Sequence, residues 1–247
     1  MTQRVALVTG AFGGLGEAAC LALGTAGFRV VGVHHHLGDD GAQWSQRMHL
    51  AGIQAETAIA EIASYASCEA MAADVAARVG AVDVVVNNAG VTHDVSFRKM
   101  QPSDWISVLE TNLFSVFNVT RCFINPMIER GFGRVINISS VNGQKGAFGQ
   151  TNYAASKAGI HGFTKALALE VAARGVTVNT VSPGYLDTKM VRAVPESILK
   201  EKILPQIPLG RLGQPDEVAA LIVYLASEKS AFVTGANFAI NGGQHMC

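Results

Sequence analysis

The sequence predicts an α/β fold, a single domain built on a doubly wound, parallel seven-stranded sheet with helices on both faces. Two patterns predict it. Short runs of β-branched residues alternate along the chain with longer, Ala-rich stretches, and this spacing is typical of right-handed βαβ units. The short runs, such as Val5–Val8 and Val82–Val86, also do not alternate apolar with polar residues. Strands of a parallel sheet, buried on both faces, have this composition.

Seven runs have the length and composition of strands, and the helices are expected between them. The first strand, 4–8, leads into a glycine-rich turn and the first helix, near 14–26. Six further strands are expected at 28–33, 54–59, 82–86, 134–138, 176–181 and 237–240. The longer stretches between them predict helices near 41–51, 67–79, 103–130, 152–173 and 214–226. Since no linker, charge block or repeat divides the chain, we expect one domain over residues 1–247.

Composition and charge exclude several classes of protein. The 247 residues are 49% hydrophobic and 15% charged, which is typical of a compact globular chain. Lys+Arg and Asp+Glu both number 19, so no basic excess indicates a nucleic-acid or membrane partner. The longest apolar run, nine residues at 218–226, is too short to cross a bilayer.

The cysteines and the first residues indicate a cytoplasmic protein. The apolar run after Met1 is too short for the core of a signal peptide. No CxxC spacing occurs among the cysteines, which predicts neither a zinc site nor disulfides but reduced thiols in the cytoplasm. They are Cys20, Cys68, Cys122 and Cys247.

The glycine-rich turn after the first strand predicts an anion-binding site. It reads Thr9-Gly10-Ala11-Phe12-Gly13-Gly14-Leu15-Gly16 and opens into the first helix. Unpaired N–H groups and the helix dipole at such an N-terminus attract a diphosphate, and glycines let the backbone approach it. The alternative is a tight strand–helix connection without a ligand. The predicted contacts are Gly10, Phe12, Gly13, Gly14, Leu15 and Gly16.

Further motifs, in this order, carry a family resemblance. Asn87-Asn88-Ala89-Gly90 follows the fourth strand, Asn112 lies in the long middle helix, and Ser140 precedes Tyr153-x-x-x-Lys157 by 13 residues. Pro183-Gly184 follows the sixth strand. Together with the glycine-rich turn, this set resembles the short-chain dehydrogenase/reductase family over essentially the whole chain. The resemblance implies a Rossmann-like fold and a nicotinamide cofactor.

The chemistry of the motif residues agrees with that resemblance. Tyr153 and Lys157 are four residues apart and share one face of a helix. A nearby ammonium lowers the pKa of a phenol, so Tyr153 would donate a proton to a ketone that Ser140 polarises. The resemblance implies that Lys157 also holds the nicotinamide ribose and that Asn112 anchors a water of the proton relay. The alternative is a Tyr/Lys pair on a helix surface and a helix-capping serine.

The resemblance also assigns further cofactor contacts. Asn88, Ala89 and Gly90 would line the adenosine, and Glu61 and Ile62 would lie at the adenine. Pro183 and Gly184 would contact the nicotinamide carboxamide, and Thr188 would lie near the diphosphate. The segment 188–213, which contains three prolines, is the expected substrate lid.

The end of the second strand predicts the choice of cofactor. An acid there binds a ribose 2′-hydroxyl, whereas an arginine accommodates a 2′-phosphate. The loop His34–Asp40 contains no arginine, and Asp39 and Asp40 would repel a phosphate. We therefore expect NADH rather than NADPH, with His35 and Asp40 at the ribose. A nest of backbone amides that holds the phosphate is the alternative. Adjacent histidine side chains diverge, so no metal site is expected.

Several stretches resemble one branch of the family, the acetoacetyl-CoA reductases of polyhydroxybutyrate synthesis. They are 97–100, 137–146, 148–153 and the tail 241–246. The resemblance implies that an acetoacetyl group lies near Ser140 and Tyr153 and is reduced to an (R)-3-hydroxyacyl-CoA. The alternatives are a 3-oxoacyl-acyl-carrier-protein reductase and a nucleotide-binding sensor without catalysis. The residues expected to shape the substrate pocket are Asp94, Lys99, Phe148, Gln150 and Tyr185.

Small residues along the helix 152–173 bear on assembly. Ala155, Gly159, Gly162 and Ala166 are spaced by four, three and four residues, which makes one face suited to close packing. The resemblance implies a homotetramer in which this face meets a second copy. Packing on the sheet of the same subunit is the alternative.

Overall fold

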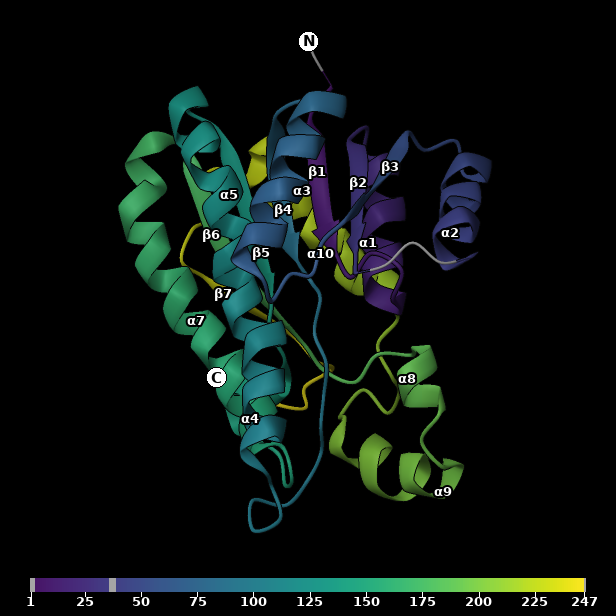
Figure 1. The fold of residues 1–247 in the computed structure, drawn as a ribbon. Coiled ribbons are helices and arrows are strands. Elements are labelled where there is room, and N and C mark those ends of the chain that lie inside the picture. The colour runs from purple at the N-terminus through teal and green to yellow at the C-terminus, as the bar shows by residue number, and fades with distance from the viewer. Residues whose placement is uncertain (1–2, 36–38, 247) are drawn as a thin grey trace.

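The structure is a computed structural model that describes residues 3–35 and 39–246. Within these residues seven strands form one sheet in the order β3-β2-β1-β4-β5-β6-β7, and every pairing between neighbours is parallel. The order reverses at β1, which lies between β2 and β4. This confirms the predicted doubly wound sheet, shown in Figure 1.

The strands lie close to their predicted positions. They are β1 (Val5–Thr9), β2 (Arg29–His34), β3 (Ala55–Ile59), β4 (Val82–Asn87), β5 (Gly133–Ile138), β6 (Val176–Pro183) and β7 (Asn237–Ile240). β6 extends two residues beyond the prediction because its pairing with β7 continues to Pro183 opposite Ile240.

Two hydrophobic cores, one on each face of the sheet, hold the helices in place. One core joins Leu7 and its neighbours to α3 (Tyr65–Arg78), α5 (Ser115–Arg130) and α7 (Thr151–Val171). The other joins Val8 and its neighbours to α1 (Gly14–Thr25), α2 (Asp39–Leu50) and α10 (Pro215–Ala226). Successive strand residues point to opposite faces, and both faces are covered. The uninterrupted apolar runs of the sequence follow from this double burial.

The long helix predicted near 103–130 is present, but the sequence did not predict the change in its hydrogen-bond pattern partway along. The structure has α4 (Pro102–Leu109), a π-helical turn η1 (Glu110–Phe114) and then α5. The π turn carries Asn112, whose side chain is fully buried and accepts from Val91 N over 2.8 Å while donating to Val91 O over 2.9 Å. A π turn inserts an extra residue and is frequent at functional sites. Here it turns Asn112 toward the loop that follows β4.

Short helices extend beyond the carboxyl ends of the strands. Between β6 and α10 the chain forms α8 (Lys189–Arg192), α9 (Glu196–Ile198), η3 (Leu199–Ile203) and η4 (Leu204–Gln206), which Figure 1 shows below the main body. A parallel β-bridge between Leu186 and Gly213 joins the two ends of this segment. The remaining short helices are α6 (Val141–Lys145), η2 (Ala172–Arg174) and η5 (Glu228–Ser230). No helix in the described part of the chain is long and apolar enough to cross a membrane.

Candidate active site

The glycine-rich turn closes tightly on itself at the end of β1. Gly10 has a φ of 63°, and a Cβ at Gly16 would lie 2.1 Å from the Gly10 carbonyl oxygen. Gly13 precedes α1 and offers no side-chain cap to its first turn. The glycines therefore leave the N-terminus of α1 accessible to an anionic ligand, and the residues present fit a diphosphate.

The segment after β4 holds this turn in place. The amide Nδ2 of Asn88 donates to Thr9 O over 3.0 Å and to Gly10 O over 3.3 Å. In return, Thr9 Oγ1 accepts from the backbone N–H groups of Asn88 and Ala89 over 3.0 and 3.1 Å. The structure thus brings together the two predicted cofactor motifs at the carboxyl ends of neighbouring strands, where ligands of such sheets bind.

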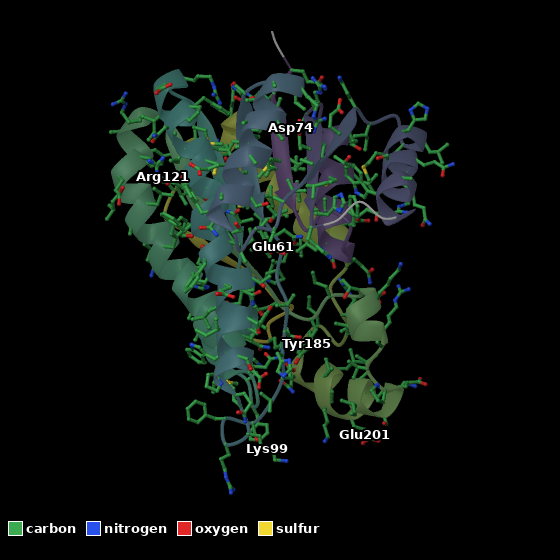
Figure 2. All side chains as sticks on the ribbon, viewed as in Figure 1. Glu61, Asp74, Lys99, Arg121, Tyr185 and Glu201 are labelled. Atoms are coloured by element: carbon green, nitrogen blue, oxygen red, sulfur yellow. The ribbon has the colours of Figure 1, made fainter. Side chains whose placement is uncertain are left out.

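Other predicted cofactor residues gather around the turn. A Cβ at Gly14 would lie 2.9 Å from Thr188 Cγ2, so the start of the 188–213 segment touches the turn directly. Pro183 ends β6, and a Cβ at Gly184 would lie 2.9 Å from the backbone of Asn241. Glu61 lies just beyond β3 (Figure 2). Ile62 is buried in the core, and its carbonyl oxygen accepts from Asn118 Nδ2 over 3.0 Å.

The end of β2 differs from the prediction at His34. The sequence placed His34 in an open loop, but it is the last residue of β2 and is buried. Its ring stacks on Phe12, with centroids 4.2 Å apart, and Phe12 stacks on Trp44 at 5.3 Å. Packing of aromatic rings against the glycine-rich turn thus overrides the polarity of the imidazole.

Sequence analysis did not single out Trp44, although a signal for it exists. A Cβ at Gly32 would lie 2.7 Å from the indole ring of Trp44, and glycine inside a strand often marks such an approach. His35 is exposed. The predicted Asp40 contact concerns a side chain outside the described residues, as do residues 36–38. No group of three metal-ligating side chains occurs in the part of the chain that is described.

The predicted catalytic residues converge between β5 and α7. Ser140 caps α6 and accepts from Asn142 N over 3.1 Å, and its side chain lies close enough to the Tyr153 phenol to lower the pKa of that group. Lys157 lies one turn after Tyr153 and donates from Nζ to Ile138 O over 2.8 Å. The structure therefore joins Ser140, Tyr153 and Lys157 in one cluster.

Asn112 lies at the edge of the same cluster, and both Asn112 and Lys157 approach Gly90. A Cβ at Gly90 would lie 3.2 Å from Asn112 Oδ1 and 3.3 Å from Lys157 Nζ. The absent side chain of Gly90 is what lets the π turn and α7 approach the loop after β4 together. Asn112 Nδ2 also donates to Ser156 Oγ over 3.2 Å, which ties the π turn to α7.

The expected lowering of the Tyr153 pKa was wrong for this arrangement. Burial raises the pKa of Tyr153, the nearby Ser140 side chain lowers it, and Asp94 and Tyr185 raise it further. The Lys157 ammonium points to Ile138 O, and burial lowers its own pKa from 10.5 to about 8. Desolvation of the phenolate is therefore the largest effect at Tyr153.

Three of the predicted substrate residues lie beside this cluster. Gln150 Nε2 donates to Asp94 Oδ2 over 2.8 Å, and Gln150 Oε1 accepts from Asn142 over 2.9 Å. Tyr185, with Asp94, is close enough to influence the Tyr153 phenol electrostatically. Figure 2 shows Tyr185 on the segment that leads toward the short helices.

The other two predicted substrate residues lie further out. Phe148 is 95% exposed. Lys99 is exposed on the long loop at the bottom of Figure 2. The loops that carry them are joined by a hydrogen bond from Val95 N to Gly149 O over 2.9 Å. The structure thus places Phe148 and Lys99 on a rim outside the cluster.

The small residues of α7 do not all face the same way. A Cβ at Gly159 would lie 2.8 Å from Leu113 Cδ2 of the π turn, so Gly159 packs within the subunit. Ala155, Gly162 and Ala166 are exposed. The face is therefore divided between internal packing and open surface.

Comparisons with known proteins agree with the geometry. The model of the short chain dehydrogenase family matches residues 4–198. The chain is 51% identical over 246 residues to an acetoacetyl-CoA reductase of Cupriavidus necator, which covers 100% of both chains. It is 50% identical to an acetoacetyl-CoA reductase of Rhizobium meliloti over 99% of each chain. It is 43% identical to a 3-oxoacyl-[acyl-carrier-protein] reductase of Pseudomonas aeruginosa over 98% of each. The chain therefore belongs to the short chain dehydrogenase family and is a nicotinamide-dependent oxidoreductase.

Proposed function

We propose that this protein is an acetoacetyl-CoA reductase that transfers hydride to the 3-keto group of a short acyl-CoA. The product would be an (R)-3-hydroxyacyl-CoA for polyhydroxybutyrate synthesis in the cytoplasm. The observation that carries the proposal is the half-buried Tyr153 phenol, with the Ser140 side chain close enough to lower its pKa and Lys157 one turn away. Relatives over the full chain with the name acetoacetyl-CoA reductase support the choice of substrate.

The cofactor would bind across the carboxyl ends of β1 and β4. The glycine-rich turn and the N-terminus of α1 would hold its diphosphate, with Thr188 beside it, and Lys157 would reach the nicotinamide ribose. When bound, the nicotinamide supplies the hydride. The fit rests on the N-terminus of α1, which Gly13 leaves without a side-chain cap, and on glycines that bring no side chain to this turn.

The protein's own residues would orient the ketone and supply the proton. Ser140 and Tyr153 present two hydroxyl groups to one place, so one carbonyl oxygen would accept hydrogen bonds from both. Since burial raises the pKa of Tyr153, its phenol stays protonated at neutral pH. A protonated phenol favours the reducing direction, in which Tyr153 donates its proton to the developing alkoxide.

The acyl-CoA would enter past the rim. The Asp94–Gln150 pair and Tyr185 would border the keto group, while Phe148 and Lys99 would contact the pantetheine and a CoA phosphate. The short helices of 188–213 would form the lid. An exposed phenylalanine gains most from a partner that covers its ring, and an ammonium at the rim suits a phosphate.

The runner-up is a 3-oxoacyl-acyl-carrier-protein reductase, and one assay separates the two. NAD(P)H oxidation is followed with acetoacetyl-CoA and with acetoacetyl-acyl-carrier protein under the same conditions. We expect kcat/KM to be at least about 10-fold higher with the CoA ester. A higher value with the carrier protein overturns the proposal, and no turnover with either favours a nucleotide-binding sensor.

We expect the enzyme to prefer NADH to NADPH. The loop after β2 has no arginine, and Arg47 of α2 makes a bidentate pair with Glu17 over 2.6 and 2.9 Å. Initial rates with both cofactors test this, and Asp40→Arg should shift the preference toward NADPH. A clear NADPH preference of the unmodified protein would instead favour a nest of backbone amides that holds the phosphate.

A homotetramer is the assembly that the surface supports best. Two sets of exposed apolar side chains lie on different elements: Phe117 and Leu169 on α5 and α7, and Tyr224 and Phe232 around η5. Two separate apolar faces allow two different two-fold contacts. By light scattering after size exclusion, we expect a tetramer for the unmodified protein and dimers for Leu169→Glu and for Phe232→Glu. A monomer at micromolar concentration would contradict the proposal.

A further inference from the structure

The face of α7 that carries the catalytic pair continues one turn further. Tyr153 and Lys157 are followed by His161, so the three residues occupy positions i, i+4 and i+8 of the helix. The Nε2 atom of His161 lies 2.8 Å from the Oγ atom of Ser139. Ser139 is 3% exposed and immediately precedes Ser140. Neither Ser139 nor His161 has a part in the chemistry derived above.

The hydrogen bonds of Ser139 fix where the protons lie. Its Oγ is 2.8 Å from the carbonyl oxygen of Lys157. A carbonyl oxygen cannot donate, so the single hydroxyl proton of Ser139 lies on that contact. The contact with His161 therefore needs a proton from the ring, and His161 donates through Nε2–H. The network thus selects one tautomer of His161.

Ser139 ties three elements together at the active site. Its backbone N–H donates to Val181 O of β6 over 2.8 Å, while its side chain bonds α7 at two points, one turn apart. A Cβ at Gly143 would lie 2.8 Å from Lys157 Cβ and 3.0 Å from Ser139 Oγ, so α6 closes directly over this junction. A shift of α7 along β5 would break these contacts together.

The consequence is a register between strand and helix. Three consecutive residues at the end of β5 meet α7: Ile138 accepts from Lys157, Ser139 bonds Lys157 and His161, and Ser140 lies close enough to Tyr153 to lower the pKa of its phenol. The outer two contacts belong to catalytic groups that must move protons or meet ligands. The middle contact starts from a buried serine and involves no reacting atom, so it can hold the other two at a fixed separation.

We propose that Ser139 and His161 are positioning residues that clamp α7 to the end of β5 and so set the distance between Ser140 and the Tyr153–Lys157 pair. The inference rests on the proposed reduction for its kinetic consequence but not for the clamp itself. Burial, and the nearby Lys165, lower the pKa of His161, so the ring is neutral at pH 8. In that state only the Nε2–H tautomer can make the contact.

The kinetic test compares variants that keep or remove the donor. His161→Phe and Ser139→Ala should lower kcat by about 10- to 100-fold and change the Kd of the cofactor less than about 2-fold. His161→Gln should retain most of kcat because its amide nitrogen replaces Nε2–H, whereas the shorter His161→Asn should not. Wild-type kcat in His161→Phe, or an equal loss in His161→Gln, overturns the clamp.

A matched control separates positioning from plain stability. Ser230 is also a fully buried serine, and its Oγ lies 2.9 and 3.0 Å from the carbonyl oxygens of Leu225 and Ser227, away from the catalytic cluster. Ser230→Ala should lower Tm about as much as Ser139→Ala while leaving kcat unchanged. If both variants lose kcat equally, the effect is one of stability and the proposal fails.

A second measurement does not depend on turnover. Long-range ¹H–¹⁵N NMR of the imidazoles at pH 8 should show His161 protonated at Nε2 and not at Nδ1, and Ser139→Ala should bring a mixture of tautomers. An Nδ1–H tautomer in the unmodified protein overturns the inference. If the unmodified protein does not reduce acetoacetyl-CoA, the proposed function fails, and the tautomer still decides on the clamp.

Discussion

Lys157 donates from Nζ to the carbonyl oxygen of Ile138 over 2.8 Å, and this bond holds an ammonium inside the protein. Lys157 is only 3% exposed. Burial alone lowers its pKa from 10.5 to about 8, so no carboxylate offsets the cost of desolvating the charge. Lys157, which we propose binds the ribose, therefore lowers the free energy of unfolding of the protein.

Lys157→Met should stabilise the protein at neutral pH. Below pH 8 the ammonium is charged in both folded and unfolded chains, so its burial cost is fully present, about 3 kcal/mol for this shift. After the lost hydrogen bond, we expect a net gain of about 2 kcal/mol.

The gain should depend on pH in one direction. Between pH 8 and 10.5 the unfolded chain holds more protons at Lys157 than the folded chain, so wild-type stability rises toward that of the variant. Urea unfolding from pH 7 to 10.5 measures the narrowing difference. Lys165→Met, on an exposed part of α7, is the control and should change little. A variant less stable than wild type at pH 7 would contradict the burial cost.

Tyr153→Phe should abolish most turnover without loss of the cofactor site. The ring still packs, but the proton donor next to Ser140 is removed, so we expect kcat to fall by about 10²- to 10⁴-fold. The Kd of the cofactor, measured by fluorescence titration, should stay within about 2-fold. Near-normal turnover would mean that another group donates the proton.

Two glycines of the same turn should respond differently to alanine. A Cβ at Gly16 would lie 2.1 Å from Gly10 O, whereas a Cβ at Gly13 would have only Gly10 O nearby, at 3.6 Å. Gly16→Ala must open the turn and should raise the Kd of the cofactor at least about 10-fold. Gly13→Ala should bind almost normally. Equal behaviour of the two variants, measured by calorimetric titration, would show that the turn is not the binding element.

Thr164→Val should show how much a buried polar network beneath the site contributes to the stability of the protein. Thr164 Oγ1 accepts from Asn137 Nδ2 over 2.9 Å and from Thr180 Oγ1 over 2.8 Å. Valine would leave two buried donors unpaired, which costs about 1–3 kcal/mol for each group. Thr25→Val, on an exposed helix end, should cost far less. The midpoints of urea unfolding measure the stability lost in each variant. Equal losses in the two variants would contradict a stabilising role of the Thr164 network.

The fold class and the catalytic spacing could be read from the chain alone. Uninterrupted apolar runs such as Val5–Val8 predict strands of a parallel sheet, because both faces of such a strand are buried. Tyr153 and Lys157 share a face because a helix repeats every 3.6 residues. Glycines at the end of β1 allow a turn that other residues cannot adopt. These are properties of local geometry, which neighbouring residues fix.

Contacts between distant segments decided the rest. The π turn at Asn112 exists where the side chain reaches Val91, 21 residues earlier. The burial of His34 depends on Phe12 from another loop, and the direction of the Lys157 ammonium depends on a carbonyl of β5. No periodicity or spacing encodes such pairs. The sequence by itself therefore determined the sheet, the turn and the spacing of the proposed proton donor, and only the tertiary structure decided their register, burial and pKa shifts, because these depend on which remote atoms replace water around each group.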